Sequence, residues 1–386
     1  MEQSEGKIYV SSPYLPEMEE YIEELRGIWQ ARWLTNNGGK HRRLESEIKE
    51  YLSAPYLALF ANGHLALEAL LKAALLLGGA EPPAQGGPLV APPAKNEVIT
   101  TPFTFVSTVN AVVNMGLTPV FCDVRPDDFT MCPRAAAALM NERTAAILPV
   151  HVYGNICDAE AFAALGAKHG VPVIYDAAHA FGVRREGAPV AALGDASMFS
   201  FHATKVFHTV EGGAAAVNSP ALLRALEMLK NHGLNEDGQA ELSGANGKMS
   251  EFHASMGLCC LRGLEGEIDK RKAVASLYRE RLGGVKGLRL NPVNAGTSEN
   301  FAYFPIIFEK EFDKTRDEVF AALNENGVVA RKYFYPAVNE HPYYASRFGA
   351  AATPVAADLS RRVLTLPLHG GVSLNDAERI CGVVTG

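Results

Sequence analysis

Two residues, Asp176 and Lys205, have side chains that could do chemistry together. Lys205 ends the run Ser200 to Lys205 (Ser-Phe-His-Ala-Thr-Lys), and Asp176 begins the run Asp-Ala-Ala-His that ends at His179. A lysine amine can hold a carbonyl cofactor as an imine, and an aspartate can pair with a pyridinium nitrogen. Together they form the minimum set for pyridoxal 5'-phosphate (PLP) chemistry, and they point to an aminotransferase.

Three short apolar runs are expected to position these two groups. Residues Val171–Asp176 end in the acid, Ala196–Phe201 end just before the lysine, and Gly212–Val217 follow after a turn. Such runs are typical of buried strands, and α/β enzymes bind ligands at the carboxyl edge of their parallel sheet. The pattern therefore predicts that Asp176 and Lys205 meet at one sheet edge.

A phosphate site is expected between the strand Tyr56–Phe60 and the helix Leu65–Leu77. The intervening residues Asn62, Gly63 and His64 place backbone amides at a helix start, where the helix dipole also favours an anion. The alternative is that Asn62 and Gly63 only turn the chain.

Composition narrows the function classes. The chain has 386 residues, of which 48% are hydrophobic, and a net charge of -7. This length can bury a large core, and the mild acidity without a basic stripe argues against nucleic-acid binding. The six cysteines lack the paired spacing of metal sites. From this spacing we expect no metal site. The sequence has no apolar run long enough for a membrane span and no signal peptide, so we also expect no membrane association and a cytoplasmic enzyme.

Apolar runs that alternate with helical stretches between Tyr56 and Val217 predict a doubly wound α/β sheet. We expect an N-terminal helical segment over 1–55, a large cofactor-binding domain over 56–263, and a linking helix with a small C-terminal domain over 264–386. The Gly- and Pro-rich stretch 78–96 is interpreted as a mobile surface insertion, with a functional lid as the alternative. The other elements expected are helices over 16–32, 41–52, 265–282 and 314–325 and a strand over 301–308.

Several motifs, in order along the chain, resemble those of the DegT/DnrJ/EryC1/StrS family of sugar aminotransferases. They are Pro149–Gly154 (PVHVYG), Asp176–Gly182 (DAAHAFG), Ser200–Lys205 (SFHATK), Glu211–Gly213 (EGG) and Asn246–Glu251 (NGKMSE). The resemblance runs from about Pro13 to Pro367. It implies the type I fold of aspartate aminotransferase, with a large domain built on a mixed, mostly parallel seven-stranded sheet and a smaller C-terminal α+β domain.

The resemblance also implies roles for further residues. Phe105 would stack on the pyridine ring, Ser200 would add a hydroxyl to the phosphate site, and Asn246 would reach the phosphate from a neighbouring subunit, which makes the unit a homodimer with shared active sites. His179 would contact the cofactor's phenolic oxygen or hold Asp176. His64 departs from the family, which usually has a phosphate-binding threonine there. Simple structural roles are the alternatives for Phe105, His179 and Asn246.

By the same resemblance, Lys205 would hold PLP as an imine, with the aminated form (PMP) appearing during turnover and L-glutamate as the amino donor. Three runs, Ser12–Pro16, Trp33–Gly38 and Lys332–Pro336, look most like enzymes that aminate dTDP-4-keto-6-deoxyglucose at C4. The alternatives are amination at C3, a UDP- or GDP-linked sugar, a PLP-dependent sugar dehydratase, which has histidine in place of Lys205, and a non-catalytic sugar-binding regulator. Candidate substrate contacts are His232, Lys248 and Tyr333.

Overall fold

The computed structural model describes residues 6–77, 95–292, 296–349 and 352–386. Of the expected insertion, residues 78–94 lie outside the described residues. No helix in the described ranges is long and apolar enough to cross a membrane.

The described residues contain a large sheet of seven strands. Strand β10 is antiparallel to both of its neighbours, and the other pairs are parallel. Backbone bridges from Ile147 to Val173 and from Val150 to Asp176 join its two halves. In spatial order the strands are β2 (Tyr56–Phe60), β10 (Gly213–Val217), β9 (Ala196–Ser200), β6 (Ile174–Asp176), β5 (Thr144–Leu148), β3 (Glu97–Thr100) and β4 (Thr118–Phe121). The mixed, mostly parallel seven-stranded sheet is thus confirmed.

Helices cover both faces of this sheet because its strands bury alternate residues on opposite sides. In β10, Ala215 and Val217 belong to one hydrophobic cluster, whereas Ala214 and Ala216 belong to the other. The first face carries α3 (Gly63–Leu77), α4 (Val106–Asn114) and α7 (Pro220–Lys230). The second face carries α2 (Gly39–Tyr51), α5 (Pro133–Leu139), α6 (Ala159–His169) and α8 (Glu251–Arg262).

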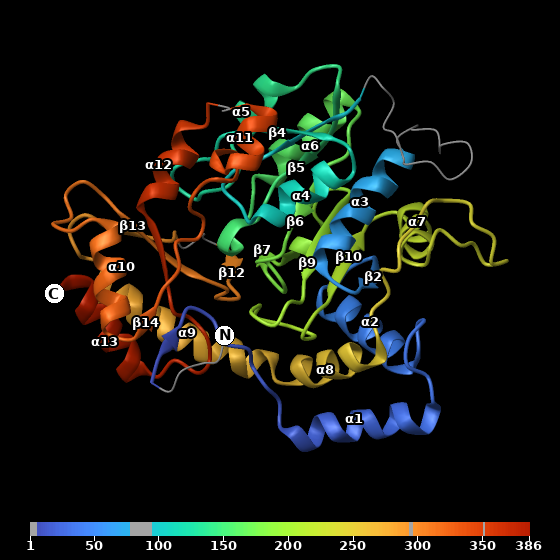
Figure 1. Cartoon of the computed structure of the whole chain (residues 1–386), viewed down its shortest axis with the longest axis horizontal. Coiled ribbons are helices and arrows are strands. Elements are labelled where there is room, and N and C mark those ends of the chain that lie inside the picture. Colours follow the sequence, from blue (N-terminus) through green and yellow to red (C-terminus); the bar gives the residue numbers. More distant parts are fainter. Residues whose placement is uncertain (1–5, 78–94, 293–295, 350–351) are drawn as a thin grey trace.

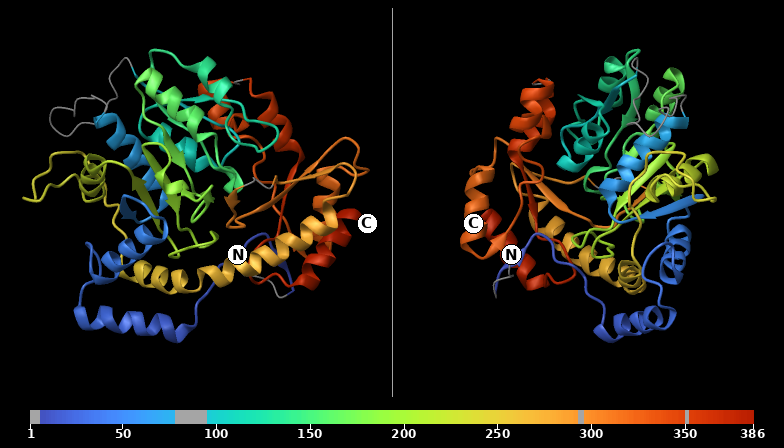
Figure 2. Two further views of the ribbon diagram at one scale, coloured as in Figure 1. Left: turned by 180° about the vertical axis from the view of Figure 1, so that it is seen from behind. Right: turned by 45° about the vertical axis from the view of Figure 1, so that its right-hand side comes forward.

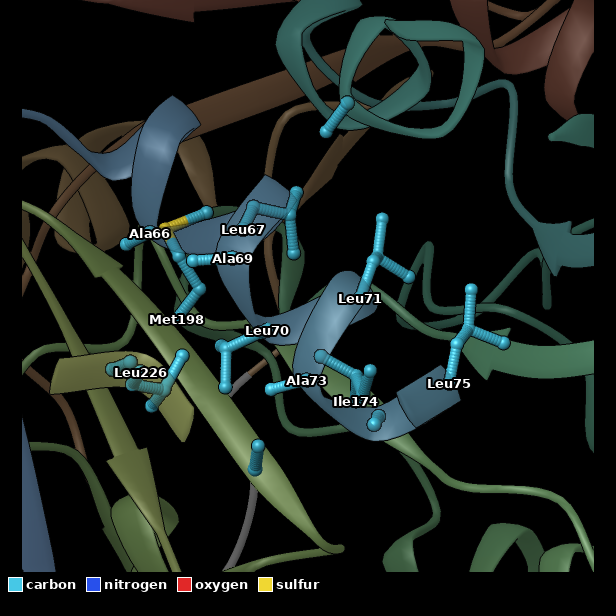
Figure 3. Packing of buried hydrophobic residues seen from close by; sticks show 14 of the residues in the cluster. Ala66, Leu67, Ala69, Leu70, Leu71, Ala73, Leu75, Ile174, Met198 and Leu226 are labelled. Atoms are coloured by element: carbon cyan, nitrogen blue, oxygen red, sulfur yellow. The ribbon is translucent and has the colours of Figure 1, made fainter. Parts of the chain in front are cut away.

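Helix α3 is the central helix of the first face (Figure 3). It is apolar nearly all round, as expected for a helix packed between a sheet and other helices. Figure 3 shows Met198 beside Ala66 and Ala69 of this helix, and Ile174 beside Ala73. The Asn62 side chain accepts a hydrogen bond from the Leu65 amide at 2.9 Å, which fixes where the helix begins.

A second, smaller sheet lies in the C-terminal part (Figure 1). It consists of the antiparallel strands β11 (Leu288–Leu290), β13 (Phe304–Phe308) and β15 (Val363–Leu366). Its apolar cluster includes residues of α9 (Leu264–Leu282), α10 (Arg316–Glu325) and α13 (Leu374–Thr385). The remaining helices here are α11 (Pro342–Phe348) and α12 (Pro354–Arg362). The expected limits of the domains stay a prediction.

The N-terminal segment contacts both parts of the molecule. Strand β1 (Ile8–Tyr9) pairs in parallel with β14 (Val328–Val329) in the C-terminal part. Helix α1 (Met18–Ala31) then runs along α8, away from the sheet (Figures 1 and 2). A short three-stranded sheet contains β7 (Arg184–Arg185), β8 (Ala188–Pro189) and β12 (Thr297–Ser298), and three short 3-10 helices cover Val152–Gly154, Val190–Ala192 and Val338–Glu340.

Most expected elements lie within a few residues of their expected bounds, but two strands are shorter. The run from Val171 becomes regular only at Ile174, because Val171 still bonds to the end of α6 through Gly166, and Pro172 has no amide to donate. The run from Phe301 becomes regular only at Phe304. Phe301 has a φ of 52°, which is incompatible with an extended strand.

Gly213 generates the first testable prediction. A Cβ at this position would lie 2.5 Å from the Gly63 nitrogen, in the adjoining β2–α3 turn. Because both partners are backbone, Gly213→Ala is expected to destabilise the protein by about 1–3 kcal/mol. Gly266→Ala is the matched control, since Gly266 is in α9 and a Cβ there meets nothing within 4 Å. It should stabilise by up to about 1 kcal/mol. Urea unfolding measures both, and equal stabilities of the two variants would contradict the close approach.

Candidate active site

A cavity of about 610 Å³ opens where β6 and β9 end and α3 begins. Its walls come from both parts of the molecule, because residues after β2, β6 and β9 face residues from the C-terminal part. Its lining includes Asn62, Gly63, His64, Thr104, Phe105, Ser107, Thr108, Asp176, His179, Ser200, Lys205, Tyr303, Tyr333 and Phe334.

Asp176 is the buried acid of this cavity, with 5% of its surface exposed. Its Oδ2 accepts a hydrogen bond from Thr108 Oγ1 at 2.7 Å, and its Oδ1 accepts one from the Ala178 amide at 3.0 Å. Burial raises the pKa of the carboxyl, while these two hydrogen bonds and the charge of Lys205 act to lower it. The donors and the cation therefore offset part of the cost of a buried carboxylate.

Thr108 is itself held by a second hydroxyl. Thr104 Oγ1 lies 2.8 Å from Thr108 Oγ1, and both side chains are buried. A hydroxyl has one hydrogen to donate, and Thr108 donates its own to the carboxylate, so Thr104 must donate to Thr108. The result is a directed chain of two hydroxyls on α4 and its preceding turn that ends on Asp176.

Lys205 follows β9 in a turn closed by its amide, which donates to the His202 carbonyl at 2.9 Å. Its Nζ lies 3.5 Å from the Tyr303 hydroxyl and 5.7 Å from the centre of the Tyr303 ring. No ion pair within the described ranges involves Lys205. The amine is therefore directed into the cavity without a carboxylate bound directly to it.

His179 is buried against aromatic rings. Its Nδ1 accepts a hydrogen bond from the Tyr153 amide at 3.0 Å, so the proton of the neutral ring is on Nε2. Its ring stacks on Phe334 at 5.9 Å and lies 4.6 Å from Tyr303, between centroids. Burial, assisted by the charge of Lys205, holds the pKa of His179 well below its usual value. His179 is thus a neutral donor.

The start of α3 forms a cup of donors. In the described part of the chain, the amides of Gly63 and His64 have no protein acceptor, as expected for the first turn of a helix. Ser200, at the end of β9, packs so closely that a Cβ on Gly63 would lie 3.0 Å from the Ser200 Cβ. This cup can receive an anion through two amides and a hydroxyl, with the helix dipole in its favour.

Two further sequence candidates line the cavity. Phe105, directly before α4, is 56% exposed, so its ring stands open at the cavity. Tyr333 comes from the C-terminal part, and its carbonyl accepts a hydrogen bond from the Tyr153 hydroxyl.

Three other candidates do not lie in this cavity. Asn246 is exposed and pairs through its backbone with Asn231. His232 is exposed, and Lys248 donates to the Asn231 side chain at 2.9 Å. Lys248 lines a separate depression of about 410 Å³ beside α7. Within one chain, these three residues cannot act at the Lys205 cavity.

Sequence reasoning missed several lining residues, among them Thr104, Ser107, Thr108, Tyr303 and Phe334. Thr104, in the turn before α4, and Thr108, in its first turn, are four residues apart, a spacing that can bring two side chains together at a helix start and that could have been noticed. Tyr303 and Phe334 come from loops of the C-terminal part, whose docking onto the sheet no local pattern predicts.

The residues present fit the cofactor that the resemblance implies. PLP carries a phosphate, a ring nitrogen that can be protonated and an aldehyde, and the cavity offers a donor cup, a buried carboxylate and an amine. Within the described ranges, no group of three or more His, Cys, Asp or Glu side chains could hold a metal ion.

Comparisons with known proteins agree with one another. The model of the DegT/DnrJ/EryC1/StrS aminotransferase family matches residues 16–385. The chain is 38% identical over 380 residues to dTDP-4-amino-4,6-dideoxy-D-glucose transaminase of Shigella dysenteriae, covering 98% of this chain and 99% of that protein. It is 36% identical over 382 residues to the transaminase of the same name from Escherichia coli, with 98% of each covered. The crystal structure of DesI in the presence of its TDP-sugar product matches with a TM-score of 0.89 at 30% identity, over 98% of this chain and 92% of that one.

The hydroxyl chain leads to the second prediction. Thr108→Val removes a hydrogen bond that lowers the pKa of Asp176, so the carboxyl should ionise at higher pH. Thr104→Val leaves that bond in place and should shift the pKa less. A 13C NMR titration of carboxyl-labelled aspartate measures both, with Asp176→Asn used to assign the resonance. An unchanged titration in Thr108→Val would show that this bond does not tune the acid.

Proposed function

The chain belongs to the DegT/DnrJ/EryC1/StrS aminotransferase family, and we propose that it transfers an amino group from an amino acid, L-glutamate, to a nucleotide-linked keto-deoxysugar. The observation that carries this proposal is the convergence of Lys205, Asp176 and the donor cup on one cavity. Aminotransferases of this family depend on PLP.

Each chemical group of PLP has a counterpart in the cavity. Gly63, His64 and Ser200 would hold the phosphate, Asp176 would accept the hydrogen bond of the protonated ring nitrogen, and Lys205 would bind the aldehyde carbon. When bound, PLP withdraws electrons from the bond that breaks at the substrate carbon, and it carries the amino group from donor to acceptor.

Lys205 would then act as the proton carrier. With its Nζ free, this amine would take the proton from Cα of the amino donor and hold it for return in the same half-reaction, while bound PLP would supply the electron withdrawal that makes this Cα–H bond acidic. In the second half of the reaction it moves a proton in the opposite direction, to the sugar carbon that receives the amino group. The lack of a bonded carboxylate leaves the Nζ free to move between these positions.

The surrounding residues orient the reaction and restrict water. Asp176 would hold the protonated ring nitrogen through a charge-assisted hydrogen bond, a contact worth about 1.5–3 kcal/mol. His179 is neutral with its proton on Nε2, so it can donate to the phenolic oxygen without adding charge. The rings of Tyr153, Tyr303 and Phe334 close the wall behind it.

The proposed acceptor is dTDP-4-keto-6-deoxyglucose, aminated at C4. Support comes from the relatives in Shigella dysenteriae and Escherichia coli, which cover nearly the whole chain. The alternatives are a 3-keto sugar and a UDP- or GDP-linked sugar. The lysine at position 205 argues against the dehydratase, and a retained cofactor site argues against a non-catalytic sugar-binding regulator.

We also propose a homodimer with shared active sites. Asn246 is exposed and lies outside its own chain's cavity, which suits a residue that serves the phosphate of a neighbouring subunit. The same reasoning applies to the substrate candidates His232 and Lys248, whereas Tyr333 would contact substrate within its own chain.

A substrate panel tests this function and gives the third prediction. With L-glutamate and PLP, dTDP-4-keto-6-deoxyglucose should be converted to a 4-amino sugar faster than its 3-keto, UDP- and GDP-linked counterparts, as scored by mass spectrometry. Lys205→Ala should lose turnover and the cofactor that borohydride traps on the protein. Lys168→Ala, in the last turn of α6, is the matched control and should behave like the wild type.

Two results would contradict these assignments. Full turnover in Lys205→Ala would remove the lysine from the mechanism. A wild-type protein that binds PLP but aminates another sugar of the panel faster would leave the aminotransferase in place and replace its substrate.

The fourth prediction concerns the shared site. Asn246→Asp should weaken PLP binding, because it puts a carboxylate against the phosphate, and Lys205→Ala should be inactive. Mixing the two variants should restore part of the activity, since one site of a mixed dimer contains both the intact Lys205 and the intact Asn246. No recovery after verified subunit exchange, or a fully active monomer in sedimentation, would refute the shared site.

A further inference from the structure

His64 is the second residue of α3, beside the donor cup, and its imidazole joins two helices. Its Nδ1 lies 2.9 Å from Ser107 Oγ on α4, and its Nε2 lies 3.0 Å from Glu68 Oε1, one turn further along α3. Asn114 donates to the same Glu68 oxygen at 2.8 Å. The ring is therefore fixed at both nitrogens, and it contributes no hydroxyl to the cup.

The partners determine which atoms donate. The Glu68 carboxylate only accepts, so His64 Nε2 must carry a proton. The hydrogen bond to Glu68 raises the pKa of His64, against an opposing effect of burial. Burial alone would raise the pKa of Glu68, but hydrogen bonds from His64 and Asn114 lower it overall. The pair thus favours an imidazolium facing a carboxylate.

Protonation at Nδ1 changes what Ser107 can do. An imidazolium donates from both nitrogens, so Ser107 Oγ accepts from Nδ1, and its single hydrogen is free to point into the cavity that Ser107 lines. In neutral His64 with its proton on Nε2, Nδ1 becomes an acceptor and takes that hydrogen for itself. The state of His64 therefore determines whether the cavity gains a hydroxyl donor.

We propose that Ser107 is an additional phosphate donor of the cofactor site, and that His64, held by Glu68, is the positioning residue that directs the Ser107 hydroxyl toward the phosphate. This inference rests on the proposed function, since it assumes that PLP occupies the cavity. The phosphate donors from this chain would then be the amides of Gly63 and His64 and the hydroxyls of Ser200 and Ser107.

The other charges around His64 are compatible with this arrangement. On α3 the charged groups are Glu68 and Lys72, and the charge of Lys72 lowers the pKa of Glu68. On α4 the groups that face His64 are Ser107 and Asn114, which are neutral. The other titratable groups of the cavity lining are Asp176, His179, His202, Lys205, Glu211, Tyr303 and Tyr333. Of all these groups, Glu68 alone exchanges a charge-assisted hydrogen bond with the imidazole.

The fifth prediction compares PLP with pyridoxal, which lacks the phosphate. Titration of the apoprotein, followed by absorbance, gives a dissociation constant for each. Ser107→Ala should weaken PLP binding about tenfold, the effect of one lost hydrogen bond to a charged group, and should leave pyridoxal binding unchanged. Ser346→Ala, an exposed serine on α11, is the matched control and should change neither constant.

His64→Ala separates positioning from direct contact. It should weaken PLP binding by less than Ser107→Ala does, since the hydroxyl remains but is no longer directed, and the double variant should lose about as much as Ser107→Ala alone, because His64 acts through that hydroxyl. In the wild type the preference for PLP over pyridoxal should fall as the pH rises through the elevated pKa of His64, whereas His64→Ala should lack that part of the pH dependence. His169→Ala, at the end of α6, is the control for loss of a histidine.

The outcomes distinguish this inference from the proposed function. If the wild type binds no PLP, the function itself fails. If it binds PLP and Ser107→Ala is indistinguishable from the wild type, Ser107 is not a phosphate donor. If the losses in His64→Ala and Ser107→Ala add fully, His64 does not act through the Ser107 hydroxyl. Thermal unfolding of each apo variant identifies a general loss of structure. Such a loss would weaken the binding of PLP and of pyridoxal alike and would also count against the proposed roles of Ser107 and His64.

Discussion

The burial of an aspartate carboxylate at the end of a central strand is the constraint on which the site depends. Removing a charge from water is costly unless donors and an opposite charge replace the lost hydration. Here the replacement comes from α4, from the Ala178 amide and from Lys205. The end of the strand is fixed on both sides. On one side the Asp176 amide donates to the Pro149 carbonyl and the His151 amide donates to the Asp176 carbonyl, and on the other side the Ala177 amide donates to the Met198 carbonyl of β9. A rigid sheet thus holds the carboxylate where the ring nitrogen of the proposed cofactor can donate a hydrogen bond to it.

The donor cup depends on close backbone approach rather than on particular side chains. A Cβ on Gly213 of β10 would lie 2.5 Å from the Gly63 nitrogen, and a Cβ on Gly63 would lie 3.0 Å from the Ser200 Cβ on β9. The same crowding brings Ser200 against the first turn of α3. A helix start positioned in this way presents its amides in a fixed direction, which is the preorganisation that anion binding requires.

The elements that a local pattern encodes could be predicted from the sequence, and the residues that meet through docking could not. The strand ends at Asp176 and Ser200, the lysine after them and the amides at Gly63 and His64 all follow from apolar runs and turn residues. Tyr303 reaches the cavity because Phe301 turns the chain with a positive φ, and Phe334 does so because the small sheet packs on the large one. Asn246 lies outside the cavity of its own chain, so its proposed role at the phosphate depends on a second copy, which no pattern within one chain fixes.

The pairing of β1 with β14 has a consequence for biosynthesis. Ile8 and Tyr9 bond to a strand more than three hundred residues later, and the Val10 carbonyl accepts from the Leu368 amide. A ribosome releases the N-terminal residues first, so Ile8 to Val10 have none of these partners until translation has passed the partner strand and Leu368. Closure of this contact therefore comes late in folding and has a large loop entropy.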